Sequence, residues 1–206
     1  MKDKKLACAS RGFTLVELLI VISLLGAIAL IVIAAINPIE QANRARDTGF
    51  KADGGQLISA AERYFVGQSV FPWVSVNPTS YTIESAFGFF TAANPEVGIC
   101  GVTGGCSVDG VLIINNEMKT EFRNRDFIQK GAVGARLDKQ IMIGKTTGAS
   151  ASVYACFVPL SKSVRQKAVA ENKVYTIGAS GSRTVTTTCI ATSDWVSLAC
   201  YVCIPE

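Results

Sequence analysis

The sequence predicts an α+β protein, in which a long N-terminal helix packs on a C-terminal head built around an antiparallel sheet. Three observations predict this fold class. Residues 13–36 form a nearly uncharged apolar run, and apolar residues then recur at helical spacing as far as Val66. Beyond residue 125 the chain contains short runs that resemble strands. A helix followed by a series of strands is the order expected of an α+β protein.

The first half of the predicted helix, residues 13–36, is a candidate membrane anchor. As a helix it would extend about 36 Å, which exceeds the hydrocarbon layer of about 30 Å. The run is longer than the apolar core of a secretory signal, and no small-residue cleavage site follows it. Basic residues precede it, so we expect a cytoplasmic N-terminus and translocation of residues 37–206. The single charged residue in the run is Glu17.

The second half, residues 37–66, is predicted to be an amphipathic helix. Asn37, Pro38 and Glu40 form a typical helix start, although one continuous helix kinked at Pro38 is an alternative. Some bend is expected in either case. The glycines at 54 and 55 predict a local loosening. We expect the charged residues between 44 and 53 to form a face exposed to solvent. The alternative is that they contact another subunit.

The head, residues 67–206, begins in a loop rich in glycine and proline. Ile114, Met118 and Phe122 have the spacing of a short amphipathic helix. Strand-like runs follow at 126–130, 138–143, 151–159, 173–178, 184–191 and 195–204. The last run has the clearest alternation and is predicted to be the best-defined strand. Its two alternating sets are Val196, Leu198, Cys200, Val202 and Ile204, and Trp195, Ser197, Ala199 and Tyr201.

Composition argues against several functional classes. The net charge of +4 comes almost entirely from residues 1–12, so no nucleic-acid surface is predicted in the rest of the chain. The chain contains no histidine, which removes the most common general base and metal ligand. It also contains no phosphate-binding or dinucleotide-binding glycine loop and no zinc-protease motif. We therefore predict no catalytic residues, no cofactor and no metal.

Six cysteines follow the anchor, and an even number beyond a membrane segment predicts disulfides. They are Cys100, Cys106, Cys156, Cys189, Cys200 and Cys203. Cys100 and Cys106 flank a glycine-rich loop and are expected to pair, whereas the other four allow three connectivities. A redox role for Cys200 and Cys203 is disfavoured because such motifs open a helix. A zinc site with four cysteines is disfavoured by the spacing of Cys100 and Cys106.

The stretch "RGFTLVELLIVIS", beginning at Arg11, resembles the class III signal of type IV pilins and of type II secretion pseudopilins. The resemblance implies a leader of residues 1–12, cleavage between Gly12 and Phe13 by a prepilin peptidase, and methylation of the new amino terminus. It gives Glu17 an assembly role, in which its carboxylate meets the amino terminus of its own or an adjacent subunit. It also raises the question of whether the segment from Gly26 to Pro38 melts on assembly.

The resemblance further implies a structural subunit that forms a helical homopolymer and contacts other pilins and an assembly platform. It would be held in the inner membrane by one span and then added to an extracellular pilus or a periplasmic pseudopilus. A type IV pilus is favoured because the head is larger than that of the usual major pseudopilin. The alternative from another class is a permanently anchored envelope protein that binds a ligand. The sequence does not choose among adhesion, motility and DNA uptake, or between a major and a minor subunit.

Overall fold

The computed structural model describes residues 12–35, 37–178 and 180–205. The chain divides into two compact units, Met1–Ile39 and Glu40–Glu206. The described part of the N-terminal unit is dominated by helix α1, Leu15–Ala35. Helix α2, Pro38–Gln68, runs through the C-terminal unit and forms one side of its core. The predicted leader, apart from Gly12, lies outside the described residues.

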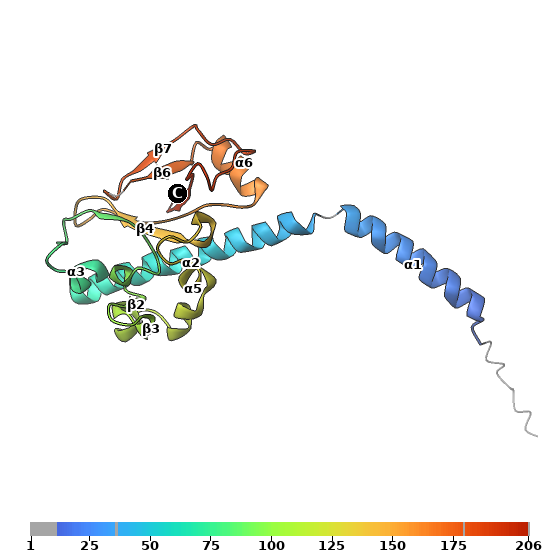
Figure 1. The fold of residues 1–206 in the computed structure, drawn as a ribbon, viewed down its shortest axis with the longest axis horizontal. Coiled ribbons are helices and arrows are strands. Elements are labelled where there is room, and N and C mark those ends of the chain that lie inside the picture. Colours follow the sequence, from blue (N-terminus) through green and yellow to red (C-terminus); the bar gives the residue numbers. More distant parts are fainter. Residues whose placement is uncertain (1–11, 36, 179, 206) are drawn as a thin grey trace, which may run out of the picture. The chain divides into compact units, whose positions relative to one another are not determined.

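A four-stranded antiparallel sheet forms the centre of the C-terminal unit. Its strands are β1 (Phe87–Thr91), β4 (Ile141–Lys145), β5 (Val153–Phe157) and β8 (Val202–Ile204), in the order β1-β4-β5-β8. Two small antiparallel pairs flank it: β2 (Cys100–Gly101) with β3 (Gly105–Asp109), and β6 (Tyr175–Ile177) with β7 (Arg183–Val185). Helix α2 lies along one side of the sheet, while β6, β7 and helix α6 (Lys162–Ala170) lie on the other (Figure 1). The predicted α+β class is confirmed.

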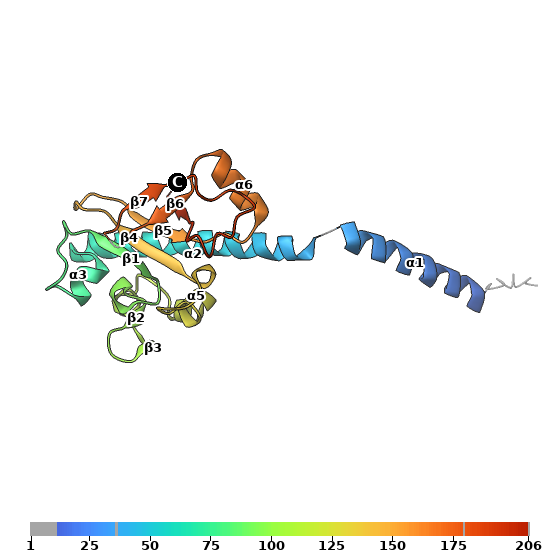
Figure 2. The ribbon, with the colours of Figure 1, turned by 45° about the horizontal axis from the view of Figure 1, so that its top comes forward.

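Short helical turns connect these elements. They are α3 (Pro72–Val76), η1 (Pro95–Val97), α4 (Val111–Ile114), η2 (Thr120–Asn124), α5 (Asp126–Gln129) and η3 (Leu137–Lys139). The turned view in Figure 2 separates the sheet from the β2–β3 hairpin and from α5. Most of these turns lie between β1 and β4, where they complete the core beside α2.

Alternation along β5 explains why the sheet has two buried faces. Ala155 and Phe157 belong to the core cluster that includes α2, whereas Cys156 belongs to a second cluster on the opposite face. That second cluster contains Trp195, Tyr201 and three other cysteines, which the C-terminal segment brings over the sheet. The sheet is therefore covered by a helix on one side and by irregular, disulfide-linked chain on the other.

The pair of glycines in α2 does not loosen the helix, which continues to Gln68. Gly54 lies where α2 passes closest to the sheet, since a Cβ at this position would approach Ile204 Cδ1 to 3.0 Å and Ala155 Cβ to 3.1 Å. The predicted loosening at Asp53–Gly55 is therefore wrong. The glycine instead permits close packing between helix and sheet.

Four predictions of local structure in the head are also wrong. In the run 184–191 only residues 184–185 lie in a strand, β7. Residues 126–129 form helix α5, in which Phe127 and Ile128 are buried, and so do not form a strand. The spacing of Ile114, Met118 and Phe122 does not mark one helix, because α4 ends at Ile114 and Phe122 lies in η2. In the run 195–204 only Val202–Ile204 forms a strand. The reason for this last failure is the packing of Trp195, which is fully buried and donates a hydrogen bond to the Ile190 carbonyl.

Candidate functional site: the start of α1 and the anchorage of α2

The Glu17 carboxylate caps the helix in which it lies. Glu17 Oε2 accepts hydrogen bonds from the Thr14 amide and from the Thr14 hydroxyl, each at 2.9 Å. The Thr14 hydroxyl oxygen in turn accepts a hydrogen bond from the Glu17 amide at 3.2 Å. Because α1 begins at Leu15, these reciprocal contacts form a capping box at the helix N-terminus.

The capping box fixes a negative charge at the end of α1 where the helix dipole is positive. The chain just before it is exposed, since Gly12 and Thr14 are accessible and Phe13 retains 84% of its accessible surface. The expected cleavage point and the carboxylate thus lie within six residues of one another. Sequence reasoning missed the cap, although threonine followed three residues later by glutamate is a recognisable signal.

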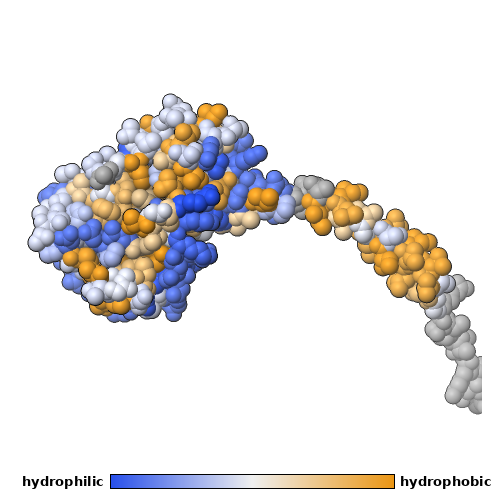
Figure 3. Space-filling view, viewed as in Figure 1, coloured by the Kyte–Doolittle hydropathy of each residue, from blue (hydrophilic) through white to orange (hydrophobic). Residues whose placement is uncertain are grey.

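The apolar surface of α1 is uncovered along its described length. Leu15–Ile33 is apolar enough to cross a membrane by length and composition, and none of it is buried within the chain. Figure 3 shows apolar residues over most of the visible surface of α1, whereas polar and apolar residues are mixed on the C-terminal unit. Such a surface requires cover from lipid or from other helices.

Gly26 and Pro38, the ends of the segment whose melting on assembly is in question and the two candidate positions for a helix kink, lie in different settings. Gly26 lies inside α1, which continues through it as regular helix. Pro38 is the first residue of α2, and α1 ends at Ala35. Proline suits the first helical position because its missing amide hydrogen is not needed there.

Glu40, in the first turn of α2, binds the N-terminus of α6. Its carboxylate accepts hydrogen bonds from the Ser161 hydroxyl at 2.7 Å, the Lys162 amide at 3.1 Å and the Ser163 amide at 3.3 Å. Burial opposes ionisation, but these donors together with Arg44 lower the pKa of Glu40 from 4.5 to about 2. The charge also complements the positive end of the α6 dipole. Glu40 therefore ties the start of α2 to a segment more than 120 residues later in the sequence.

Glu40→Gln should lower the free energy of unfolding at neutral pH, and this loss should disappear in acid. Because the pKa of Glu40 is depressed on folding, its contribution is present above pH 4.5 and is lost as the pH falls toward about 2. At neutral pH the variant should unfold at a lower denaturant concentration than the unaltered chain. The difference between the two midpoints should shrink as the pH falls from 4.5 toward about 2. Glu62→Gln, an exposed change on α2, is the control and should not alter the pH dependence. A constant difference down to pH 2 would contradict the assignment.

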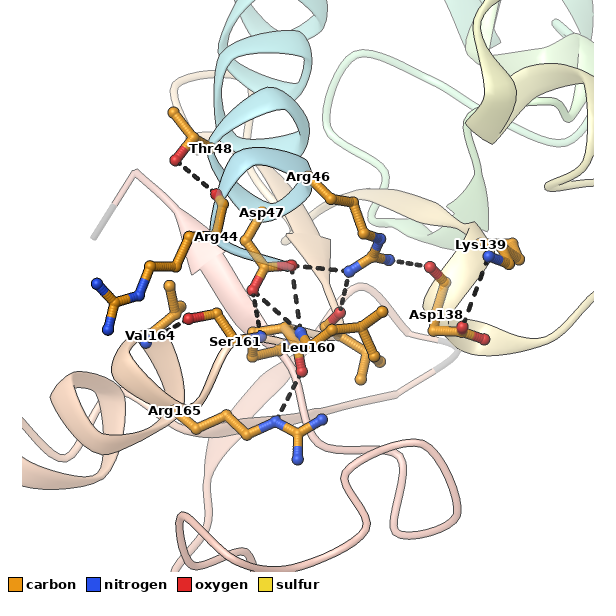
Figure 4. Close-up of polar contacts among 12 residues, drawn as sticks. Arg44, Arg46, Asp47, Thr48, Asp138, Lys139, Leu160, Ser161, Val164 and Arg165 are labelled. Carbon is orange, nitrogen blue, oxygen red and sulfur yellow. Dashed lines mark hydrogen bonds and ion pairs between the residues drawn. The ribbon is translucent and has the colours of Figure 1, made fainter. Parts of the chain in front are cut away.

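A second polar contact, around Asp47 and Arg46, lies about two turns further along α2. The buried Asp47 carboxylate accepts hydrogen bonds from the Leu160 amide at 3.0 Å and the Ser161 amide at 2.8 Å. Arg46 donates to Asp47 Oδ1 at 2.8 Å, to the Val158 carbonyl at 3.1 Å and to the Asp138 carbonyl. Figure 4 shows Arg46 and Asp47 directed together at these loops.

This contact corrects the prediction that residues 44–53 are a solvated charged face. Asp47 and Asp53 are buried, and the Arg46 side chain retains only 18% of its accessible surface. Burial raises the pKa of Asp47, while the two amides and Arg46 oppose this rise. Of this stretch, only Arg44 and Lys51 match the expected exposure among its long charged side chains. The charged stretch thus joins α2 to the segment that follows β5.

The six cysteines beyond α1 form three disulfides. Cys100 and Cys106, the pair expected from the sequence, are joined, as are Cys156 with Cys203 and Cys189 with Cys200. The second bridge links the neighbouring strands β5 and β8, and the third closes the loop that carries Trp195. Within the described residues, no group of three or more Asp, Glu, Cys or His side chains could hold a metal ion.

Comparison with known proteins identifies the N-terminal segment. Residues 8–33 match the family described as the prokaryotic N-terminal methylation motif. No curated protein and no solved structure shows significant similarity to the chain. The matched residues include Gly12, Phe13, the capping box and most of α1, and the motif belongs to a family of structural proteins processed by prepilin peptidase. The chain therefore carries, at residues 8–33, the prepilin signal of the type IV pilin and pseudopilin family.

Proposed function

We propose that this chain is the structural subunit of a type IV pilus filament, held in the inner membrane by α1 before assembly and then added to the polymer through the same helix. The observation that carries this proposal is the uncovered apolar surface of Leu15–Ile33 directly after a prepilin signal. A helix of this kind is stable in lipid, and it is also stable when identical helices surround it. The same surface therefore serves the anchored and the assembled states.

In this proposal Glu17 selects the axial position of each added subunit. Cleavage after Gly12 creates an ammonium group on Phe13, and the capping box holds the Glu17 carboxylate at the same end of the helix. In an apolar bundle a carboxylate and an ammonium attract each other strongly, and a position that leaves either unpaired is costly. Pairing between adjacent subunits would fix their register.

Electron microscopy of filaments sheared from cells, followed by mass spectrometry of their subunits, tests the proposal. We expect filaments that contain this chain with a methylated Phe13 as its first residue. A chain that keeps Met1 and stays in the membrane fraction would instead support a permanently anchored envelope protein. Filaments confined to the periplasm would identify a pseudopilus subunit.

Gly12→Val should leave the full-length precursor in the membrane. The branched side chain would stand directly before the bond to be cut, where the prepilin signal has its glycine. Immunoblotting of membrane fractions should show only the precursor, because uncleaved chain retains the leader. Glu17→Ala is the control, since it alters the signal beyond the cleavage point and should still be processed. Cleavage of the Gly12→Val precursor at the unaltered rate would contradict the assigned site.

A further inference from the structure

A hollow in the C-terminal unit has the chemistry of a small-ligand site and does not take part in the proposed assembly. It lies between the loop that follows α3, the start of η1, the end of β1 and the loop closed by Cys100 and Cys106. Its volume is about 680 Å³, which is within the range of ligand sites in proteins. The side chains available for binding are those of Asn77, Ser80, Tyr81, Phe90, Asn94 and Glu96.

The polar side chains of the hollow hold one another in place. Asn77 Nδ2 donates to Glu96 Oε1 at 3.0 Å, and the Tyr81 hydroxyl donates to Glu96 Oε2 at 3.3 Å. The Glu96 amide donates to Asn94 Oδ1 at 2.8 Å. Burial and the neighbouring carboxylate raise the pKa of Tyr81, so its hydroxyl keeps its proton. A site whose groups are oriented before binding loses less entropy when a ligand enters.

The aromatic side chains of the hollow rest on the core. Tyr81 contacts Phe87 edge to face, with ring centroids 5.4 Å apart, and Phe90 contacts the same ring at 4.9 Å. Phe87 is fully buried and stacks on Trp73 at 4.4 Å. The rings of Tyr81 and Phe90 therefore both pack against the buried Phe87, and each remains partly accessible from the hollow.

The charges in the hollow restrict the class of ligand. No lysine or arginine is among the described residues that line it, so phosphates and other anions have no partner there. Glu96 is its one charged group in the described chain, and both carboxylate oxygens already accept a hydrogen bond from a neutral donor. The two asparagines and Ser80 add further donors and acceptors around the rings. A simple organic cation would not use these amide and hydroxyl groups.

We propose that this hollow binds a neutral saccharide unit, with sugar hydroxyls bound to Glu96, Asn77 and Asn94 and the apolar side of the sugar ring packed on Tyr81 and Phe90. A pyranose presents neighbouring hydroxyls that each donate and accept, which matches planar amide and carboxylate groups. Its C–H groups supply the apolar contact that aromatic rings favour. The binding would not depend on filament assembly, so its failure would leave the filament proposal intact.

The test uses the mature full-length chain in a polyoxyethylene detergent, which contains neither sugar nor cation. Saturation-transfer NMR would be recorded with the methyl glycosides of glucose, galactose, mannose and N-acetylglucosamine. We expect at least one of them to bind with roughly millimolar affinity, as is typical of a small ligand with few contacts. Glu96→Gln should weaken that binding about tenfold, because a hydrogen bond to a charged acceptor is lost. Tyr81→Phe, which keeps the ring, should have a smaller effect than Tyr81→Ala.

Glu62→Gln is the matched control, because it removes one exposed carboxylate outside the hollow and should bind as the unaltered chain does. Tryptophan fluorescence, to which the buried Trp73 and Trp195 both contribute, reports whether each variant keeps its fold. Absence of saturation transfer from all four glycosides would overturn the proposal, as would binding that Glu96→Gln and Tyr81→Ala leave unchanged. Tighter, Glu96-dependent binding of tetramethylammonium would also overturn it and would identify a cation site.

Discussion

Glu17→Gln should abolish filament assembly while leaving cleavage and methylation of the chain intact. Glutamine keeps an oxygen that can accept the hydrogen bonds of the Thr14 amide and hydroxyl, so the cap of α1 should survive. It removes the charge that is proposed to meet the ammonium of a neighbouring Phe13. Breaking an ion pair in apolar surroundings costs about 3–5 kcal/mol, so filament yield should fall by roughly 100-fold or more.

Thr14→Val provides the complementary change. It removes the hydroxyl from the capping box but keeps the Glu17 charge and the Thr14 backbone amide donor. Loss of part of a cap costs on the order of 1 kcal/mol, so these cells should still produce filaments. Filaments would be counted by electron microscopy after shearing, and methylated Phe13 would be measured by mass spectrometry. Normal filaments from Glu17→Gln together with none from Thr14→Val would show that capping, and not charge pairing, is what assembly requires.

Asp47→Ala should be among the most destabilising single changes in the C-terminal unit. It would leave the partly buried Arg46 guanidinium without its carboxylate and the amides of Leu160 and Ser161 without their acceptor. Removal of one partner from a buried, hydrogen-bonded ion pair typically costs 3–5 kcal/mol. We therefore expect a loss of about this size in the free energy of unfolding of the mature chain in detergent micelles.

Denaturant unfolding followed by tryptophan fluorescence would measure this loss, because Trp73 and Trp195 are both buried and lie in different core clusters. Asp126→Ala is the matched control. Asp126 also pairs with a basic residue, Lys130, but its side chain retains 76% of its accessible surface, so the cost should stay below about 1 kcal/mol. Equal losses in the two variants would show that the Asp47 contact contributes no more than a surface ion pair.

The parts of the fold that depend on local pattern could be predicted from the sequence. The apolar run and the helical spacing that follows it are properties of consecutive residues, and α1 and α2 follow directly from them. The capping box at Thr14 is equally local and could have been identified from its spacing. The approximate positions of β4, β5 and β6 were also predicted, because each lies in a short apolar run. Strands β4 and β5 belong to the central sheet, and β6 belongs to a flanking pair.

The parts that depend on distant partners could not be predicted. Asp47 is buried because amides more than 110 positions away bind it, and nothing near it in the sequence indicates this. Lys145 is fully buried, and its ammonium donates to the distant carbonyl of Ile83 as well as to the neighbouring carbonyls of Thr146 and Gly148. In residues 195–204, the burial of Trp195 and a disulfide at Cys200 outweigh an alternating pattern that favours a strand. Tertiary contacts decided these cases against local preference.

The bridge between Cys156 and Cys203 has a mechanical consequence for a subunit that carries load. Strand β8 is only three residues long and lies at the edge of the sheet, so its ladder with β5 is short enough to peel apart one hydrogen bond at a time. Because Cys156 and Cys203 are directly opposed in that ladder, the disulfide is a covalent rung in the middle of it. Tension on the C-terminal strand would then be borne by a bond that does not yield at the forces that break hydrogen bonds. A pulled subunit would have to open elsewhere first.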